Sequence, residues 1–351
     1  MSELILTLNA GSSSIKFAVY QVDGETLVQT HKGQVEGIGS APHFIARSVA
    51  GQLLAESYWE PASIGQGHAR AFKQIWSWLD AIAAGERLMA IGHRVAHGGE
   101  TYARPVLIDE TVIAELTRLI PLVPLHQPSN LAPIRAIAAD HPALPQVACF
   151  DTSVHHGRAK VTEQLALPRA LLDRGVKRYG FHGLSYEVIA HRLREIAPEV
   201  AEGRVVVAHL GSGCSMTALR GGRSVDTSMG FSALDGVPMG TRPGALDAGV
   251  LLYLLREDRL TVSDLEDLLY KRSGLLGLSG VGNDLRALHA SDDPAAAEAI
   301  DFFVYRVGQM LGQDQGHALA AAFHSEDVVE HDGARSAGWR HSLLDCRFEK
   351  K

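Results

Sequence analysis

The stretch LILTLNAGSSSIKFAVY, residues 4–20, decides the fold, because two apolar runs flank a turn of small polar residues. Leu4–Leu8 and Ile15–Tyr20 are predicted to be strands, since apolar runs bounded by Asn, Gly and Ser are typical of strands joined by a turn. A second turn at Val22–Gly24 leads into a third predicted strand. The chain therefore begins with an antiparallel strand, turn and strand unit.

The same pattern recurs about two hundred residues later. Arg204–His209 is an apolar run, LGSGCS at 210–215 supplies a second small polar turn, Met216–Leu219 continues the strand, and RGGR at 220–223 reverses the chain again. Two such units, each followed by helical segments, predict an internally duplicated α/β protein whose two halves face each other across a cleft.

Helices are predicted between the repeats wherever apolar residues recur at spacings of three and four. Ala71–Ala84, Thr111–Leu119 and Tyr186–Ile196 have this pattern. Four prolines are expected to break the region after the second of these helices into loop: Pro121, Pro124, Pro128 and Pro133.

Leu144–Phe150 is predicted to be a buried strand that ends at Asp151. The carboxyl end of a strand is a common place for a site residue in α/β proteins. The domain limits are set there, with domains at 1–151 and 152–312 and an atypical tail at 313–351.

Composition narrows the class of protein. With 351 residues and 46% hydrophobic content, the chain can bury one or two sizeable cores. The opening MSELILTL lacks a basic leader and is followed by Asn9, so neither a signal peptide nor a membrane span is expected. Cys149, Cys214 and Cys346 show no paired spacing, which favours free thiols and a cytoplasmic location. The net charge of −7 argues against nucleic acid and anionic membrane as partners.

The turn Asn9–Ser14, followed by Lys16, combines backbone N–H groups, hydroxyls and an ammonium, which suits phosphate oxygens. It is no Walker A loop, because G-x-x-x-x-G-K-[ST] does not occur in the sequence. A plain hairpin turn is the alternative, since Gly, Asn and Ser dominate turns. Its repetition at 210–215 favours a nucleotide held by two phosphate turns.

The segment GHRVAHGGE, residues 92–100, places Arg94 beside flexible glycines. A guanidinium binds a carboxylate or phosphoryl group in bidentate fashion. Further charged residues with glycine or hydroxyl neighbours are Asp151, His182 and Arg242. Together they supply what phosphoryl transfer to a carboxylate requires, although His182 or Asp151 alone could equally be a satisfied polar residue or a helix cap.

With these residues in view, the sequence resembles the acetate kinase family, whose members belong to the actin-like and sugar-kinase superfold. The likeness covers roughly residues 3–311 through nine blocks in the family's order: LNAGSSSIKF, GHRVAHGGE, PLHQP, FDTSVH, RYGFHGLSY, VVAHLGSGCS, DTSMGFSALDG, MGTRPGALD and GLSGVGNDLR.

The resemblance implies two duplicated actin-like, ribonuclease H-like domains with the active site in the cleft between them. It implies reversible phosphoryl transfer between ATP and a short-chain carboxylate, with Mg²⁺ or Mn²⁺, giving an acyl phosphate and ADP. A homodimer is also implied.

Carried over residue by residue, the resemblance makes Arg94 and Arg242 ligands of the carboxylate and the phosphoryl group, His182 the donor to its equatorial oxygens, and Asp151 the catalytic acid. Asn9 would also face the metal. The acyl pocket would comprise Arg94, Ala96, Leu122, Phe181 and Ala233. The nucleotide and its phosphates would contact Asn9, Ser12, Ser14, Lys16, His209, Leu210, Gly211, Ser212, Gly213, Asp284, Leu285 and Arg286.

Three positions depart from the family pattern. Family members typically have valine at Ala96, proline at Ala233 and asparagine at Ser212. The first two changes enlarge the expected acyl pocket, and one methylene is worth roughly 1 to 3 kcal/mol of discrimination. Propionate is therefore expected to compete with acetate.

The tail 313–351 departs more strongly. The family continues from this point through an apolar strand into a glycine-rich G-I-G-E-N adenosine loop and a late glutamate, none of which is expected here. A frameshift or premature end is one explanation, and a lineage-specific replacement is the other. Three hypotheses on function follow: an active acetate or propionate kinase, a catalytically impaired remnant that keeps nucleotide binding, and an actin-like filament or chaperone ATPase, which no sequence feature favours.

Overall fold

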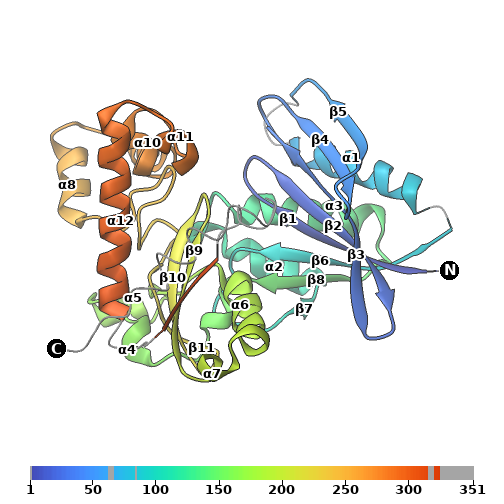
Figure 1. Cartoon of the computed structure of the whole chain (residues 1–351), viewed down its shortest axis with the longest axis horizontal. Coiled ribbons are helices and arrows are strands. Elements are labelled where there is room, and N and C mark those ends of the chain that lie inside the picture. Colours follow the sequence, from blue (N-terminus) through green and yellow to red (C-terminus); the bar gives the residue numbers. More distant parts are fainter. Residues whose placement is uncertain (1, 62–66, 84, 315–319, 325–351) are drawn as a thin grey trace. The chain divides into compact units, whose positions relative to one another are not determined.

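The computed structural model describes residues 2–61, 67–83, 85–314 and 320–324, which form two compact units (Figure 1). The first unit comprises Met1–Gly157 and Glu163–Leu184, and the second comprises Arg158–Thr162 and Ser185–Lys351. Backbone hydrogen bonds within the first unit, such as Gly183 N–H to Asp151 O at 2.8 Å, explain why the later segment belongs to it. The domain limits predicted from the repeat stay a prediction.

The first unit is built on an eight-stranded mixed sheet, in the order β5-β4-β3-β2-β1-β6-β8-β7. Its strands are β1 Glu3–Ala10, β2 Ile15–Asp23, β3 Thr26–Glu36, β4 His43–Ser48, β5 Leu53–Tyr58, β6 Arg87–Val95, β7 Val106–Leu107 and β8 Gln146–Phe150. The two predicted opening strands, the third strand and the buried strand before Asp151 are all confirmed.

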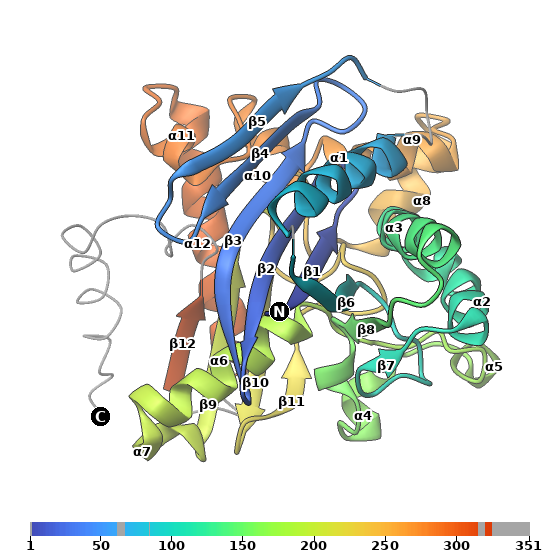
Figure 2. The same ribbon diagram turned by 90° about the vertical axis from the view of Figure 1, so that its right-hand side faces the viewer.

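The two faces of this sheet differ because side chains alternate along each strand. On β1, Leu4, Leu6 and Leu8 are buried. They form one core with residues of α1 (Gly67–Ile82), which packs on β2 and β4, while α3 (Gln127–Asp140) packs on β1 and β6 (Figure 2). The residues between them, among them Thr7 and Asn9, point to the opposite face of the sheet.

Helix α3 corrects one expectation. Pro128 and Pro133 were expected to lie in loop, yet both lie in this helix. Pro128 occupies the first turn, where a backbone N–H has no helical partner and its loss costs little. Pro133 is buried inside the helix, where packing against the sheet outweighs the missing helical bond. Pro121 and Pro124 do lie outside the α-helices.

The second unit contains a four-stranded sheet in the order β11-β10-β9-β12. Its strands are β9 Arg204–Leu210, β10 Cys214–Arg220, β11 Arg223–Thr227 and β12 Ala320–His324. The remaining helical elements of the chain are α2 Glu110–Arg118, η1 Ile120–Leu122, η2 Ser153–His155, α4 Lys160–Glu163, α5 Arg169–Leu172, α6 Gly183–Ile196, α7 Pro198–Ala201, α8 Ala248–Arg256, α9 Val262–Lys271, α10 Gly274–Ser279, α11 Leu285–His289 and α12 Pro294–Asp314.

The two sheets repeat one topology. In the first, β3, β2 and β1 are antiparallel neighbours and β6 lies parallel to β1. In the second, β11, β10 and β9 are antiparallel neighbours and β12 lies parallel to β9. The internally duplicated α/β architecture is therefore confirmed. Among the described residues, no helix combines the length and apolar character needed to cross a bilayer.

Strand β12 is a second correction. No apolar strand was expected after residue 312, because apolar residues do not recur at a regular spacing along the tail. The backbone of Ala320–His324 nevertheless pairs with β9 in register from Val205 to His209. The buried β9 leaves an edge whose backbone groups need partners, and a short apolar run satisfies them. The expected absence of an adenosine loop falls on residues 325–351, which lie outside the described part of the chain.

A buried polar pair ties β6 to β8 on the core side of the first sheet. His93 is 2% exposed and its Nε2 lies 2.9 Å from Oε1 of Gln146. Burial lowers the pKa of His93 from 6.5 to about 4, although the bond to Gln146 opposes that shift. The imidazole is therefore neutral in the folded protein near pH 7, with Nε2–H as the donor.

This pair generates a prediction about pH. Because the folded-state pKa of His93 lies below the unfolded value, the unfolded chain takes up the proton first, and stability falls as the pH drops from about 6.5 towards 4. Between pH 7.5 and 5.5 this histidine should remove about 1.4 kcal/mol. Thermal unfolding of His93→Gln should show a smaller fall in Tm over that range than wild type.

The matched control is His191→Gln, which removes an exposed histidine from α6. Its pH dependence should follow that of wild type. Equal pH dependence in wild type and both variants would contradict the assignment of a buried neutral imidazole at residue 93.

Candidate active site

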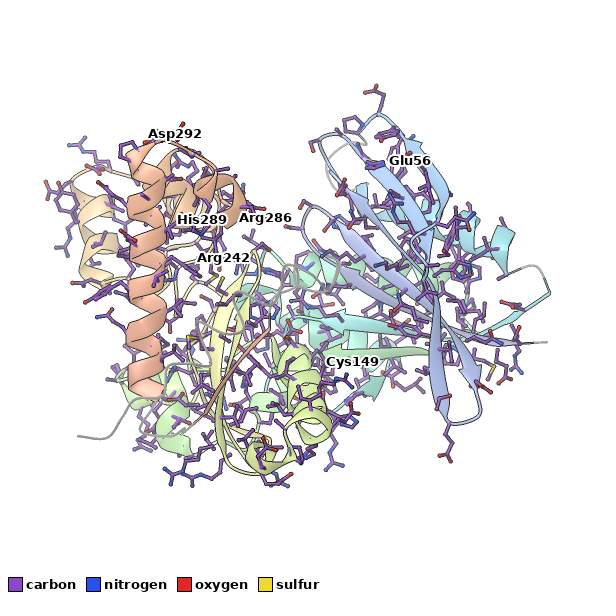
Figure 3. The ribbon with its side chains drawn as sticks, viewed as in Figure 1. Glu56, Cys149, Arg242, Arg286, His289 and Asp292 are labelled. Carbon is purple, nitrogen blue, oxygen red and sulfur yellow. The ribbon has the colours of Figure 1, made fainter. Side chains whose placement is uncertain are left out.

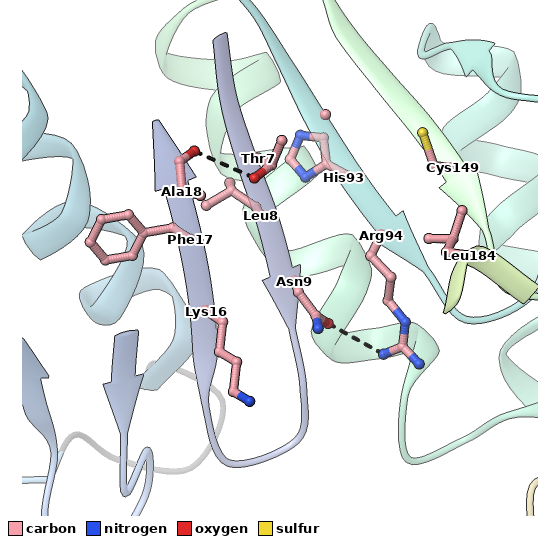
Figure 4. Close-up of a pocket in the computed structure, with 11 residues that line it drawn as sticks. Thr7, Leu8, Asn9, Lys16, Phe17, Ala18, His93, Arg94, Cys149 and Leu184 are labelled. Carbon is pink, nitrogen blue, oxygen red and sulfur yellow. Dashed lines mark hydrogen bonds between the residues drawn. The ribbon is translucent and has the colours of Figure 1, made fainter. Parts of the chain in front are cut away.

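Four side chains form a row across adjacent strands of the first sheet, on the face opposite α1 and α3. Asn9 on β1 pairs directly with Lys16 on β2 and with Arg94 on β6, and Arg94 pairs in turn with Cys149 on β8. All four line one cavity, shown in Figure 4. Residues far apart in the sequence thus meet because they occupy equivalent positions in the strand register.

Arg94 forms an ion pair with Asp151 at the end of this row. Its Nε and Nη2 both donate to Oδ2 of Asp151, at 3.0 and 2.5 Å. The side chain of Asp151 is only 5% exposed, so the guanidinium supplies the charge partner that a buried carboxylate needs. Asp151 N–H donates to Val95 O at 3.0 Å, which anchors the residue where β8 ends beside β6.

Arg94 is the cation of its segment because the neighbouring histidines are neutral. Burial lowers the pKa of His97 to about 4, with a smaller contribution from His156. His93 has the same low value for the same reason. Segment 92–100 therefore presents one permanent positive charge at pH 7, that of Arg94.

The cavity below the row has a volume of about 400 Å³. Its lining also includes the small residues Thr7, Ala18 and Gly92, each two positions from a member of the row along the same strand. Small residues leave room above the sheet, which explains why a hollow forms there. The described residues that line it include none of the predicted acyl-pocket residues except Arg94.

The predicted His182 lies in an unusual backbone conformation. Its φ is 60°, in the left-handed region that costs a non-glycine residue free energy. The residues on both sides of His182 are fixed by hydrogen bonds. Nε2–H of His155, which is 2% exposed, donates to Phe181 O at 2.9 Å, and Gly183 N–H donates to Asp151 O. Such a conformation persists only where neighbours fix it, and it is typical of functional sites.

The turn between β1 and β2, predicted to bind phosphate and named here the first phosphate turn, is short and tightly closed. Gly11 N–H donates to Ser14 O at 2.8 Å, and Ile38 N–H donates to Ser13 O at 2.9 Å. Ser12 is exposed and Ser14 is half-buried. Asn9 and Lys16 flank the turn and line the cavity together with Arg94, which pairs with Asp151. The other predicted residues of this turn, Ser12 and Ser14, are not among the lining residues.

The second unit contains the corresponding turn between β9 and β10. Gly211 N–H donates to Gly213 O at 3.2 Å, and Ser212 O accepts from Gly240 N–H at 3.3 Å. His209 is buried, with Nδ1 3.0 Å from the hydroxyl of Ser185, and is therefore part of the packing below the turn. Leu210, the last residue of β9, is half-buried.

Arg242 and the α11 residues lie in the same unit (Figure 3). Arg242 Nη1 donates to Ala233 O at 2.9 Å, which joins a predicted catalytic residue to a predicted pocket residue. Asp284 caps α11 and pairs with Arg286 at 2.7 Å, and this bond is the main reason that the pKa of Asp284 falls to about 2. Leu285 is half-buried beside them.

The remaining pocket residues lie in the first unit. Ala96 and Phe181 are buried at 2% and 3% exposure, and Leu122 is half-buried in η1. Sequence analysis missed three buried polar residues behind these loops, namely Gln127, Asn130 and Thr152. Thr152 Oγ1 accepts from Gly98 N–H at 3.0 Å, and Gln127 Nε2 donates to His97 O at 3.1 Å. For Gln127 and Thr152 the signal was present in the PLHQP and FDTSVH blocks, where polar residues interrupt apolar ones, whereas Asn130 lies outside both blocks.

Comparison of the sequence with known proteins places it in one family. The sequence profile described as the Acetokinase family matches residues 4–321. An acetate kinase of Nitrobacter hamburgensis is 52% identical over 326 residues, covering 92% of this chain and 79% of the relative. An acetate kinase of Rhodopseudomonas palustris is 48% identical over 336 residues, covering 95% of this chain and 82% of the relative.

Solved structures that resemble this chain have related names. A propionate kinase from Francisella tularensis superposes with a TM-score of 0.82 at 34% identity, covering 89% of this chain and 80% of its own. An acetate kinase from Porphyromonas gingivalis superposes with a TM-score of 0.78 at 32% identity, covering 90% and 80%. The predicted actin-like fold class is confirmed by these neighbours and by the duplicated sheets, while the cleft between domains stays a prediction.

The contact between Gly183 and Asp151 generates a prediction. A Cβ at residue 183 would lie 2.2 Å from Asp151 O, which is backbone and cannot move without shifting Asp151. Gly183→Ala should therefore lower the free energy of unfolding by about 2 kcal/mol or more. Denaturant unfolding measures this loss.

Gly308→Ala is the matched control. Gly308 lies inside α12 and a Cβ there would meet nothing within 4 Å, so alanine should raise stability by about 0.5 to 1 kcal/mol. A Gly183→Ala protein as stable as wild type would show that the backbone contact does not constrain Asp151.

Proposed function

The chain belongs to the Acetokinase family, and we propose that it transfers the γ-phosphoryl group of ATP to the carboxylate of acetate, reversibly, giving acetyl phosphate and ADP. The observation that supports this most directly is the ion pair beside the cavity, in which Nε and Nη2 of Arg94 donate to the carboxylate of Asp151. A guanidinium held in this way beside a phosphate turn is suited to anions that must approach each other.

The proposal gives each charged residue one task. Arg94 and Arg242 bind the carboxylate and the phosphoryl group, and their charges oppose the repulsion between two anions. His182 donates to the equatorial oxygens of the group in flight, and its fixed left-handed backbone supports a preset direction. Asp151, which the family resemblance makes the catalytic acid, holds Arg94 in place as a carboxylate. The role proposed for Arg242 rests on the family motif, because this residue belongs to the second unit.

In-line transfer needs little covalent chemistry from the protein. The transition state is loose and spreads charge over the phosphoryl oxygens, so positioning and electrostatic stabilisation provide most of the rate. A covalent intermediate on the protein is unnecessary. The residues proposed here supply the positive charge and hydrogen-bond donors for that purpose.

The nucleotide phosphates are assigned to the two turns. Asn9, Ser12, Ser14 and Lys16 would contact them from the first unit, while Asp284, Leu285 and Arg286 would contact the nucleotide from the second. The second phosphate turn comprises His209, Leu210, Gly211, Ser212 and Gly213. The exposed hydroxyl of Ser212 supports its use in place of an asparagine amide.

Mg²⁺, or Mn²⁺, is proposed as the cofactor. Asn9 offers an exposed amide oxygen at the end of β1, and this is the hard oxygen donor that Mg²⁺ prefers alongside nucleotide phosphates. The carboxylate of Asp151, held by the Arg94 that also contacts Asn9 at 3.4 Å, adds negative charge nearby. No cluster of three or more His, Cys, Asp or Glu side chains that could hold a metal occurs among the described residues, so nucleotide phosphates and water would supply the other oxygens that Mg²⁺ needs. When bound, the ion would neutralise charge on the phosphate oxygens.

The alternative is a propionate or other short-chain carboxylate kinase, or an impaired remnant. The neighbour named as a propionate kinase favours the first of these, as do the small buried side chains of Ala96 and Ala233. The proposed partners are acetate or propionate and ATP, with no nucleic acid and no membrane, in a cytoplasmic homodimer. Size-exclusion chromatography with light scattering tests the dimer.

Hydroxylamine trapping of acyl phosphate tests the proposal. With ATP, Mg²⁺ and acetate, the wild-type chain should give acetyl hydroxamate. Arg94→Lys keeps the charge but loses the planar donors to Asp151, so kcat/KM should fall by about 10²- to 10³-fold. Arg47→Lys on β4 is the control, since Arg47 does not line the cavity and donates to the loop carbonyl of Gly51 at 3.2 Å, and it should match wild type.

The outcomes separate the hypotheses. Hydroxamate from wild type supports the kinase. Binding of ADP without any hydroxamate supports the remnant and rejects turnover. Equal activity in wild type and Arg94→Lys would reject the role given to Arg94.

The acyl preference has its own test. Propionate should show a kcat/KM within about tenfold of the acetate value, because each missing methyl in the pocket is worth about 1 to 3 kcal/mol. Ala96→Val should shift the ratio towards acetate, since it restores bulk at a buried position. A wild-type preference for acetate far above tenfold, or an unchanged ratio in Ala96→Val, would contradict the enlarged pocket.

A further inference from the structure

Asn130 on α3 connects the two loops that carry the candidate active-site residues. Its Nδ2–H donates to Ala10 O at 2.5 Å, and its Oδ1 accepts from Ala96 N–H at 2.8 Å. Ala10 is the last residue of β1 and opens the first phosphate turn, while Ala96 follows the last residue of β6. Asn130 is 1% exposed, so both bonds are made in the core.

The side-chain amide of Asn130 lies where the pairing of β1 with β6 ends. The register between β1 and β6 runs to Asn9 and Arg94 and ends there. Beyond that pair, β1 turns towards β2, whereas the chain after β6 continues into the glycine-rich segment. One side-chain amide bonds to a carbonyl of the first segment and to an N–H of the second, so it joins the two segments just beyond the end of their register.

Only a short primary amide can do this. The carbonyl of Ala10 needs a donor and the N–H of Ala96 needs an acceptor, and Asn offers both from one rigid group. Aspartate would set an acceptor against the Ala10 carbonyl, and leucine would leave both backbone groups buried without a partner, which is costly. The chemistry of the two backbone groups therefore specifies asparagine.

A neighbouring residue supports the same arrangement. Gln127, one turn earlier on α3, donates through Nε2 to His97 O at 3.1 Å and to Leu116 O at 3.2 Å. It holds the segment after β6 to α3 and α2. Asn130 bonds both to this segment and to the end of β1.

We propose that Asn130 is a positioning residue that sets the distance between the first phosphate turn and Arg94. The inference rests on the proposed function, because that distance matters when a phosphate bound at the turn must meet a carboxylate bound at Arg94. A misplacement of about 1 Å can cost on the order of 10²-fold in rate. Asn130 touches neither reactant, so its effect is exerted through the backbone of Ala10 and Ala96.

The test uses Asn130→Asp and Asn130→Leu in the full chain, with Ile137→Ala as control. Ile137 lies further along α3, is fully buried and belongs to the core below the sheet, so its truncation lowers Tm without touching either loop. Hydrogen–deuterium exchange is followed in segments 10–15 and 95–99, together with kcat in the hydroxamate assay, well below the Tm of each variant.

Both Asn130 variants should speed exchange about tenfold in the two segments together, as expected for loss of a bond worth about 1.4 kcal/mol. They should lower kcat by about 10- to 100-fold, whereas Ile137→Ala should change kcat by less than about threefold. Asn130→Asp keeps an acceptor for Ala96, so it should loosen 10–15 more than 95–99.

The other outcomes overturn the inference. If Asn130→Leu and Ile137→Ala loosen the two segments equally, Asn130 is an ordinary core residue. If exchange rises but kcat is unchanged, the spacing does not govern the reaction. If wild type gives no hydroxamate, the proposed function fails, while exchange in the two segments still decides whether Asn130 joins them.

Discussion

The parallel pairing of β1 with β6 is the constraint on which the candidate active site depends. It places Asn9 opposite Arg94 and, through the neighbouring strands, brings Lys16 and Cys149 into the same row. A slip of one residue would turn Arg94 into the core and expose His93 in its place, because side chains alternate between faces. Burying a guanidinium without its partner is so costly that the register and the site stabilise each other.

Duplication explains why the rest of the chain follows the same plan. A strand, small turn and strand unit leaves one edge unsatisfied, and in each unit a parallel strand covers that edge, β6 in the first and β12 in the second. The turn then lies at the carboxyl end of the parallel pair. This geometry gives each unit one turn with exposed backbone groups, and the repetition suits a ligand with several phosphates.

Sequence patterns could predict the parts of this structure that depend on local alternation. Strands β1, β2, β9 and β10, helices α1, α2 and α6, and Asp151 at the end of β8 were all predictable in this way. Helix α3 was not, because Pro128 and Pro133 disfavour a helix locally and only packing on the sheet overrides them. Strand β12 depends on a partner more than a hundred residues earlier, so no local pattern reveals it. Asn130 escaped for the same reason, since its partners Ala10 and Ala96 are distant in sequence and are backbone groups.

A chain with net charge −7 must attract anionic substrates locally, and the role proposed for Arg94 meets this need without a strongly positive surface. Its Nε and Nη2 edge is held by the nearly buried Asp151, which fixes the plane of the guanidinium. Its Nη1 points towards Asn9 at 3.4 Å, a distance too long for a strong bond. A guanidinium that Asp151 already orients loses less conformational entropy when it binds an anion. Asp151 thus strengthens the site through rigidity, although its charge has the same sign as the substrate.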